Sequence, residues 1–184
     1  GFLKNITNSK KLHGLEINKN CIKFLKKKEI NVIDNLENNK LKFDVITMFH
    51  VLEHLPNQIN ILKRLRQNLD NNGKIIIEVP SASDLLISFK NLKSFKKFTF
   101  WSEHIILHTR DSLKKVLKAS GFKNIRVINF QRYNLNNHLG WFLNNSPGGH
   151  LIFKDIYDEE LNAAYSDFLV RKNKTDTLIA IANK

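Results

Sequence analysis

Short apolar runs alternate with segments of helical spacing along most of the chain. Residues 11–17 and 31–33 form two such runs, and between them residues 19–28 place apolar side chains three and four positions apart, as an amphipathic helix does. Residues 43–49 are apolar nearly throughout, which a strand buried on both faces of a parallel sheet requires. The first part of the chain therefore predicts strand, helix, strand and strand.

The rest of the chain continues the alternation, with one irregular aromatic stretch over residues 81–108. A proline at position 56 precedes a leucine-rich helix that is expected to end near Gly73, and Thr109 is a typical N-cap for another helix. The further expected elements are strands over 74–79, 125–130 and 177–182, and helices over 113–119 and 155–171.

Alternating strands and helices with short connections are typical of a Rossmann-like, doubly wound α/β fold with a mostly parallel sheet. One domain over 1–184 is expected, with residues 131–171 forming a substrate-side insertion before the last strand. The strand and glycine loop that normally open such a fold are not found after Gly1. We therefore expect a missing first strand, and we expect strand 11–17 not to pair with strand 43–49.

Composition limits the class of protein. The 184 residues are 42% hydrophobic, which suffices for a packed core, and no apolar run is long enough to span a membrane. The single cysteine excludes an internal disulfide and fits a cytoplasmic protein. The formal charge of +13 suits a polyanionic partner, but the lysines are scattered, so a nucleic-acid partner is not favoured.

Polar residues that could bind a ligand or take part in catalysis follow two of the expected strands. Glu16 closes the run 11–17, where a carboxylate can accept hydrogen bonds from the vicinal hydroxyls of a ribose; an ordinary exposed acid explains it about as well. Phe49 and His50 end strand 43–49, and Glu53-His54 follow within one turn. Apolar walls with a few polar anchors suit a sulfonium cofactor.

The motifs over residues 11–130 resemble class I S-adenosylmethionine-dependent methyltransferases, the broad group that includes ubiquinone-type O-methyltransferases and bacterial sugar or natural-product methyltransferases. The resemblance rests on Phe-Asp-Val-Ile at 43–46, Val-Leu-Glu-His at 51–54, Gly-Lys-Ile-Ile-Ile-Glu-Val-Pro at 73–80, Trp-Ser-Glu-His at 101–104 and Ala-Ser-Gly-Phe at 119–122. It implies S-adenosylmethionine as cofactor and an antiparallel last strand over 177–182.

The resemblance also implies roles for individual residues. Gly1 would end the glycine loop, Glu16 with Ile17 would hold the ribose, and Phe49 with His50 would border the methionine part. The edge of the adenine would lie against Asp34, Asn35 and Leu36. The aromatic and polar residues of the two irregular segments would bind the methyl acceptor: Trp101, Tyr133, Asn137, His138 and Trp141; a loop folded on its own aromatics is the alternative.

Methyl transfer is an in-line displacement, so a base is needed only where the acceptor must lose a proton. His104, His54 and Glu103 are the candidates, with His104 expected to face His50 across the pocket. Glu53 is expected to cap a helix or bond a loop. Ubiquinone-type relatives associate a Glu-x-x-Glu-His cluster with a divalent ion; here His50 replaces the first acid, so no metal is expected.

The favoured function is therefore methyl transfer to a small polar metabolite, such as a sugar or a surface-glycan precursor. A nucleic-acid-modifying methyltransferase is the alternative supported by charge, and a non-catalytic binding protein that keeps the fold is a third. An NAD-dependent reductase is weaker, because Val-Leu-Glu-His has no role there. The sequence does not define the acceptor atom or the oligomeric state.

Overall fold

The computed structural model describes residues 5–6, 11–33, 35–36 and 39–184, so Gly1 and Asp34 lie outside the described residues. Contacts divide the chain into two compact units, residues 1–42 and 43–184. Each unit is described by itself, and the single domain expected over 1–184 stays a prediction. Among the described helices, none combines the length and the apolar character that crossing a bilayer requires.

The first unit contains a two-stranded parallel sheet and one helix. Strand β1 (His13–Leu15) pairs with β2 (Asn31–Ile33), and helix α1 (Lys19–Lys27) connects them. Asn18 caps α1, because its side chain accepts the backbone N–H groups of Asn20 and Cys21. The predicted strand–helix–strand unit is confirmed, with β1 shorter than the apolar run 11–17.

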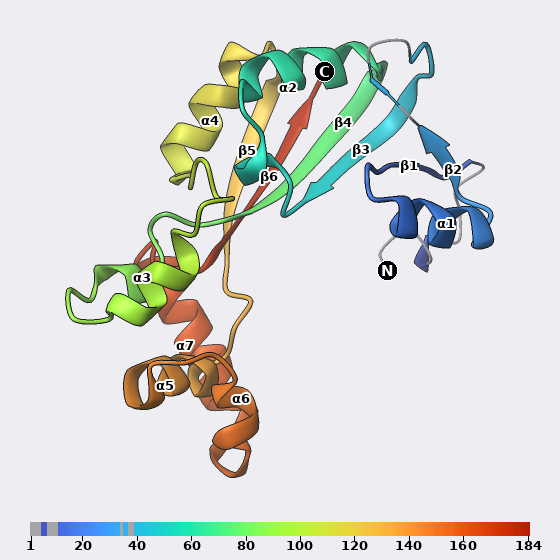
Figure 1. The fold of residues 1–184 in the computed structure, drawn as a ribbon. Helices are drawn as coiled ribbons and strands as arrows, with labels where there is room; N and C mark the ends of the chain where they lie inside the picture. The colour runs from blue at the N-terminus through green and yellow to red at the C-terminus, as the bar shows by residue number, and fades with distance from the viewer. Residues whose placement is uncertain (1–4, 7–10, 34, 37–38) are drawn as a thin grey trace. The chain divides into compact units, whose positions relative to one another are not determined.

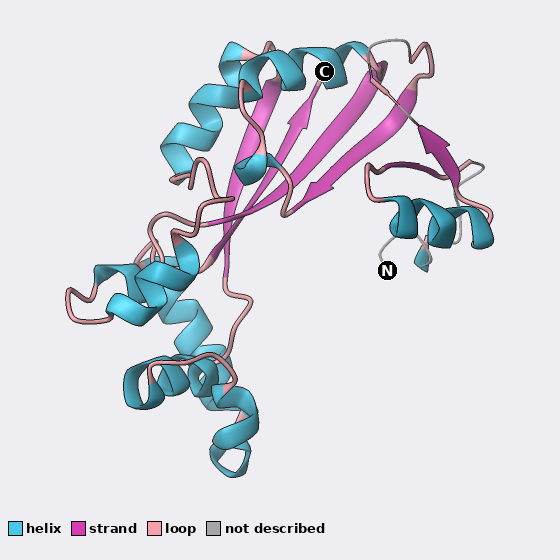
Figure 2. Cartoon of the chain, viewed as in Figure 1, coloured by secondary structure: helices cyan, strands magenta, loops and turns pink. Residues whose placement is uncertain are grey.

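The second unit is built on a four-stranded mixed sheet in the order β3-β4-β6-β5 (Figures 1 and 2). Strand β3 runs parallel to β4, whereas β6 is antiparallel to both of its neighbours. The antiparallel last strand is therefore confirmed. The sheet strands are β3 (Phe43–Phe49), β4 (Leu69–Pro80), β5 (Lys123–Phe130) and β6 (Thr177–Asn183).

Helices α2 (Gln58–Gln67) and α4 (Arg110–Ala119) pack against each other and against the sheet (Figure 1). They cover fully buried side chains of β4, among them Ile75, Ile77 and Val79. Thr109 is the N-cap of α4, as the sequence predicts, and it forms a capping box with Ser112. Burial of this face supplies the apolar core that holds the sheet in place.

The end of α2 differs from the prediction. The helix stops at Gln67, and residues 69–73 already belong to β4, so Gly73 is not a helix cap. A Cβ on Gly73 would lie 2.9 Å from the carbonyl oxygen of Phe43, in the region where the β3–β4 register shifts. Glycine is therefore required there for a close approach of two strands rather than for helix termination.

The segment between β5 and β6 is helical throughout most of its length. Besides the expected C-terminal helix α7 (Glu159–Arg171), it contains two α-helices that were not expected, α5 (Leu135–Asn144) and α6 (Gly149–Ile152), and the short 3₁₀ turn η4 (Lys154–Ile156). In α5, a Cβ on Gly140 would lie 2.7 Å from Cα of Gly149. Gly140 therefore lets α6 pack closely against α5.

Two short helices lie in the irregular aromatic stretch, η3 (Leu86–Ser88) and α3 (Lys93–Thr99). Leu86, Leu92 and Phe95 form a buried cluster with Trp141 of α5, and the rings of Phe95 and Trp141 meet edge to face at 5.0 Å. This cluster joins α3 to the helical segment after β5. We call residues 131–176, the connection from β5 to β6, the helical lobe.

Strand β1 pairs with β2 in the described residues. The expectation that strand 11–17 does not pair with strand 43–49 stays a prediction, since the two strands belong to different units. Strands β3 and β5 are the outer strands of the larger sheet. The missing first strand itself stays a prediction.

Candidate functional site

His50 lies at the point where the chain leaves β3. Its backbone N–H donates to the carbonyl of Glu78 in β4, and its φ of 51° places it in the left-handed region. That conformation turns the chain sharply into η2 (Leu52–His54) and directs the imidazole toward the carboxyl end of the sheet. The backbone alone therefore sets the direction of the His50 side chain.

The imidazole of His50 contacts three charged side chains. Its Nδ1 lies 3.3 Å from the Glu53 carboxylate, and its Nε2 lies 3.1 Å from Glu78 and 2.6 Å from Nη1 of Arg132. One nitrogen cannot serve both of the latter partners: protonated Nε2 donates to Glu78, whereas neutral Nε2 accepts from Arg132. Glu53 is the main reason that the pKa of His50 is raised, against the opposing effect of burial.

Asp176, at the entry to β6, positions the segment that carries Arg132. Its carboxylate accepts the backbone N–H groups of Arg132 and Tyr133 at 3.0 and 2.9 Å, and the side-chain amide of Gln131 at 2.8 Å. Because three donors converge on one buried carboxylate, the chain after β5 has a defined direction. The guanidinium of Arg132 then lies 5.5 Å from the ring centre of Tyr133.

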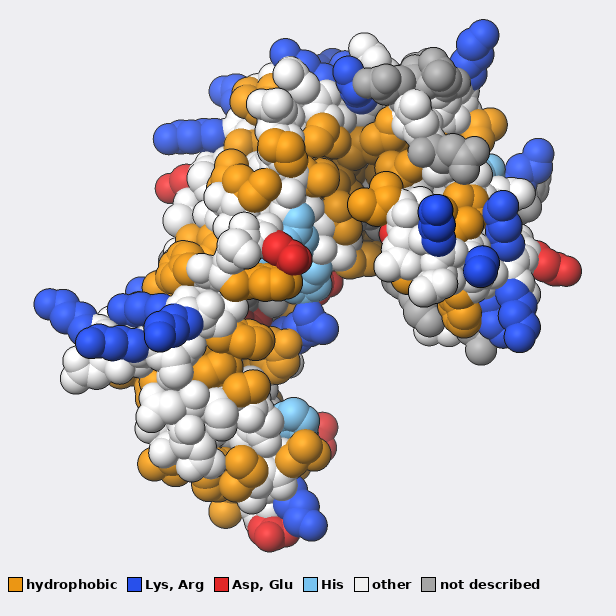
Figure 3. All heavy atoms as spheres, viewed as in Figure 1, with side chains coloured by type: hydrophobic (Ala, Val, Ile, Leu, Met, Phe, Trp, Pro, Cys, Tyr) orange, Lys and Arg blue, Asp and Glu red, His pale blue; other side chains and the backbone are white. Residues whose placement is uncertain are grey.

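Beside His50 lies a second group, formed by Glu53, His54 and His104, which we call the histidine group. One ligand atom from each of these residues lies within 4.8 Å of the others. The two imidazole rings are 4.9 Å apart, and Trp101 contacts both of them. Figure 3 shows histidine and acidic side chains next to each other at the surface of the second unit, bordered by apolar side chains.

Both histidines of this group donate Nδ1–H to a backbone carbonyl. His54 bonds the carbonyl of Glu103 at 2.8 Å, and His104 bonds that of Thr99 at 2.7 Å. A carbonyl can only accept, so each neutral ring carries its proton on Nδ1 and keeps a lone pair on Nε2. Glu103 enters the group through its backbone, while its side chain is exposed.

Glu53 differs from the sequence-based expectation. It is fully buried, and among the described residues neither of its carboxylate oxygens accepts a hydrogen bond. It does not cap η2, for which no side-chain cap is found. Its nearest charged neighbour is His50, and its backbone carbonyl accepts the N–H groups of Ile105 and Ile106. Expecting a structural cap was wrong, because the carboxylate points into the protein and not at a helix end.

The cofactor candidates of the first unit lie around the ends of its strands. Glu16 directly follows β1, and its Oε1 accepts the backbone N–H groups of Ile17 and Asn18, both at 2.8 Å. These bonds orient the carboxylate at the strand end, where the sequence predicts it. Ile17 and Asn35 are exposed and Leu36 is half-buried. Gly1 and Asp34 lie outside the described residues.

The five acceptor-binding candidates fall into two classes. Trp101 and Tyr133 are exposed by 45% and 47%, so they are accessible to an acceptor. Asn137, His138 and Trp141 are buried within the helical lobe. The Nδ1 atom of His138 forms a hydrogen bond of 2.7 Å with the hydroxyl of Tyr165, and burial lowers the pKa of His138 to about 4. Trp141 belongs to the buried apolar cluster with Leu86, Leu92 and Phe95.

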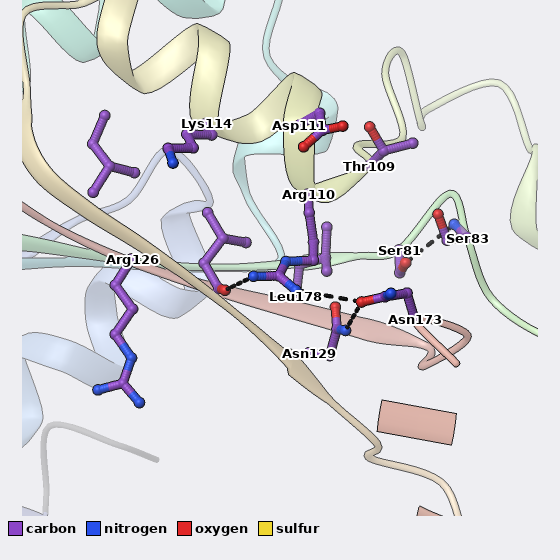
Figure 4. Close-up of a pocket in the computed structure, with 12 residues that line it drawn as sticks. Ser81, Ser83, Thr109, Arg110, Asp111, Lys114, Arg126, Asn129, Asn173 and Leu178 are labelled. Carbon is purple, nitrogen blue, oxygen red and sulfur yellow. Dashed lines mark hydrogen bonds between the residues drawn. The ribbon is translucent and has the colours of Figure 1, made fainter. Parts of the chain in front are cut away.

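A cavity of about 540 Å³ lies elsewhere, where α4 meets β5 and the start of β6 (Figure 4). Three cationic side chains line it, Arg110, Lys114 and Arg126, and one acid, Asp111. Arg110 donates to the carbonyl of Val127 at 3.1 Å, an interaction visible in Figure 4. None of the site residues expected from the sequence line this cavity.

Sequence reasoning missed Glu78 and Arg132 as members of the site. Glu78 is a carboxylate within the apolar run 75–79, and a charge at such a position is a usable signal. Arg132 gives no such signal, because its role depends on Asp176, which is 44 positions away. Its contribution is set by the pairing of β5 with β6 rather than by local sequence.

Known proteins resemble the chain over most of its length. A family model described as a methyltransferase domain matches residues 2–127. A curated relative, the tRNA U34 carboxymethyltransferase of Aliarcobacter butzleri, is 28% identical over 99 residues, which are 52% of this chain and 31% of that protein. The aligned segment is thus less than a third of the relative's length.

Solved structures share the fold at low identity. A SAM-dependent methyltransferase from Archaeoglobus fulgidus superimposes with a TM-score of 0.58 at 19% identity, covering 94% of this chain and 75% of that one. Phosphoethanolamine N-methyltransferase 2 from Haemonchus contortus, in complex with S-adenosyl-L-methionine, gives a TM-score of 0.56 at 14% identity, covering 94% and 43%. These similarities establish the Rossmann-like fold.

Proposed function

The chain belongs to the family of methyltransferase domains, whose methyl donor is S-adenosylmethionine, and on that premise we propose that it methylates a small polar metabolite. Hydroxyl-rich acceptors such as sugars and surface-glycan precursors fit the proposal best. The observation that carries it is the charged group at the carboxyl end of the sheet, in which His50 lies against Glu78 and Arg132. Such a group offers donors and acceptors together.

The cofactor roles expected from the sequence are kept as proposals. Glu16 would accept the ribose hydroxyls, since its carboxylate is already oriented by two backbone N–H groups. Ile17 would lie beside the ribose, Asn35 and Leu36 would line the adenine, and Phe49 with His50 would border the methionine part. The cofactor supplies an electrophilic methyl group on its sulfonium.

For an acceptor that must lose a proton, we propose His104 as the base, with His54 as its neighbour. The Nε2 atoms of both rings are available to take a proton, because both Nδ1 atoms donate to carbonyls. Trp101, which contacts both rings, and Tyr133, beside Arg132, would form the accessible walls of the acceptor site. Asn137, His138 and Trp141 would support these walls from within the lobe.

The test measures formation of S-adenosylhomocysteine with a panel of hydroxyl-rich acceptors. Arg132→Ala should raise the KM of an accepted substrate about tenfold or more, as expected when a charged hydrogen bond is lost, while cofactor affinity changes little. Arg171→Ala, at the exposed end of α7, is the matched control. Equal KM values in the two variants would remove Arg132 from the acceptor site.

A nucleic-acid acceptor is the second candidate, favoured by the formal charge of +13, by the cation-lined cavity and by the name of the curated relative. RNA binding through phosphates weakens linearly with the logarithm of salt concentration. If this alternative holds, Arg126→Ala should reduce that slope by about one unit. RNA binding without steep salt dependence speaks against it.

A further inference from the structure

The histidine group has the geometry of a cation site. Glu53 and His54 come from η2, and His104 comes from the segment after α3, about fifty positions later in the chain. Their nearest ligand atoms lie within 4.8 Å of one another, with His54 Nε2 at 3.9 Å from Glu53 Oε1. Two distant parts of the sequence therefore meet with three competent ligands.

The ring orientations fit metal ligation. Metal-binding histidines usually donate their second ring N–H to a backbone carbonyl or a carboxylate, which fixes the tautomer and directs the other nitrogen at the ion. His54 and His104 both do so, to the carbonyls of Glu103 and Thr99. Both Nε2 atoms therefore keep a lone pair that is able to ligate a cation.

The state of Glu53 is a second, independent observation. A fully buried carboxylate is costly unless its oxygens are paired, and here neither oxygen accepts a hydrogen bond from a described residue. His50 approaches Oε1 at 3.3 Å as an ion pair, which compensates only part of this cost. A cation between Glu53 and the two histidines would supply the missing compensation.

We propose that Glu53, His54 and His104 bind a divalent cation of the zinc type. Two imidazoles and one carboxylate form a typical three-residue zinc set with a fourth position open, whereas Mg²⁺ and Ca²⁺ prefer oxygen ligands. Ligands around tetrahedral zinc lie about 3.3 Å apart. Side-chain rotation would therefore have to shorten the present separations by about 0.6–1.5 Å.

Binding would have two consequences for the chain. The Glu53 carbonyl already holds Ile105 and Ile106, so the cation would add a second link between η2 and the segment that carries His104. It would also occupy the Nε2 lone pair through which His104 is proposed to take a proton. A bound cation should therefore inhibit turnover, although the metal site itself does not depend on the proposed function.

The experiment is a metal titration of the full chain in the absence of cofactor and acceptor. Protein is treated with a chelator, exchanged into buffer and titrated with Zn²⁺ in competition with a chromophoric chelator. One equivalent should bind, and Co²⁺ should give the intense visible absorption of a tetrahedral site. His104→Gln and Glu53→Gln should each weaken Zn²⁺ binding by about 100-fold.

His150→Gln, an exposed histidine of α6, is the matched control and should bind as the unsubstituted protein does. Circular dichroism checks folding, and His54→Gln replaces any variant that fails it. The proposal is overturned if no Zn²⁺ binds, if the control weakens binding equally, or if an equal concentration of Mg²⁺ displaces Co²⁺. Because neither cofactor nor acceptor is present, methyl transfer cannot influence the result.

Discussion

The guanidinium of Arg132 lies 2.6 Å from Nε2 of His50, although the two residues are 82 positions apart. Because arginine can only donate, this contact requires an unprotonated Nε2, while the nearby Glu78 favours the protonated form. His50 is therefore placed between two partners that prefer different charge states. The left-handed backbone of His50 is what brings its ring to this position.

That backbone conformation predicts an order of stability. Asparagine tolerates the left-handed region and β-branched residues do not, so His50→Val should be less stable than His50→Asn by about 1–2 kcal/mol. Urea denaturation measures the difference, and both variants lack the imidazole. The same pair at Thr47, in the extended backbone of β3, should show the opposite order. Equal stabilities at position 50 would contradict the prediction.

Glu16→Ala should weaken binding of S-adenosylmethionine by about 1–3 kcal/mol, because charged hydrogen bonds to ribose hydroxyls would be lost. Isothermal titration calorimetry measures the change, with Glu160→Ala, an exposed acid of α7, as control. A folded Glu16→Ala variant with unchanged affinity would exclude Glu16 from the site.

His104→Ala should reduce turnover by about 10²–10⁴-fold while leaving cofactor affinity nearly unchanged, if His104 is the base. The assay is run with chelator, so that no cation occupies the histidine group, and His150→Ala serves as control. Loss of cofactor affinity without loss of turnover at saturation would assign His104 a binding role instead.

Two buried groups should give opposite pH dependences of stability. Burial lowers the pKa of His138 to about 4. Its contribution to the free energy of unfolding is therefore fully present above pH 6.5 and is lost as pH falls toward 4. Burial, with Asp176 nearby and Lys174 opposing, raises the pKa of Asp84 to about 7, so its contribution is present below pH 3.8 and is lost as pH rises through 7.

Between pH 4 and 6.5, His138 makes the free energy of unfolding rise with pH, whereas Asp84 makes it fall. Asp84→Asn should therefore make the free energy of unfolding increase more steeply with pH, and His138→Gln should make it increase less or decrease. Urea denaturation at several pH values measures both. If the free energy of unfolding varied with pH in the same way in both variants, the opposite roles of Asp84 and His138 would be contradicted.

The type and bounds of an element were predictable where they follow from local pattern. The run 43–49 becomes a strand with the expected bounds, and Thr109 starts α4 with the expected cap. The expected burial of the run 43–49 on both faces was wrong, because β3 is an outer strand of the described sheet and only Met48 in it is buried. The prediction failed at Gly73 and in α5, where glycines serve close approaches between segments. A local pattern cannot distinguish a glycine that ends a helix from one that lets another backbone come near.

For the candidate site, the sequence identified residues but not their partnerships. Phe49 to His54 were expected from their place after a buried strand, and the structure places Glu53 and His54 beside His104. The partnership of His50 with Arg132 depends on the pairing of β5 with β6. Long-range pairing of this kind leaves no trace in spacing, so Arg132 was missed, whereas Glu78 was detectable as a charge within the apolar run 75–79.

The order of the strands has a consequence for synthesis of the chain on the ribosome. Strand β6 lies between β4 and β5 but is made after both, and Lys74 of β4 pairs with Asn183. Until β6 emerges, β5 has no neighbour among the described strands, and one edge of β4 stays open. Such edges attract other chains, and non-local pairing forms slowly. A nascent chain should therefore depend on chaperones until β6 has left the exit tunnel.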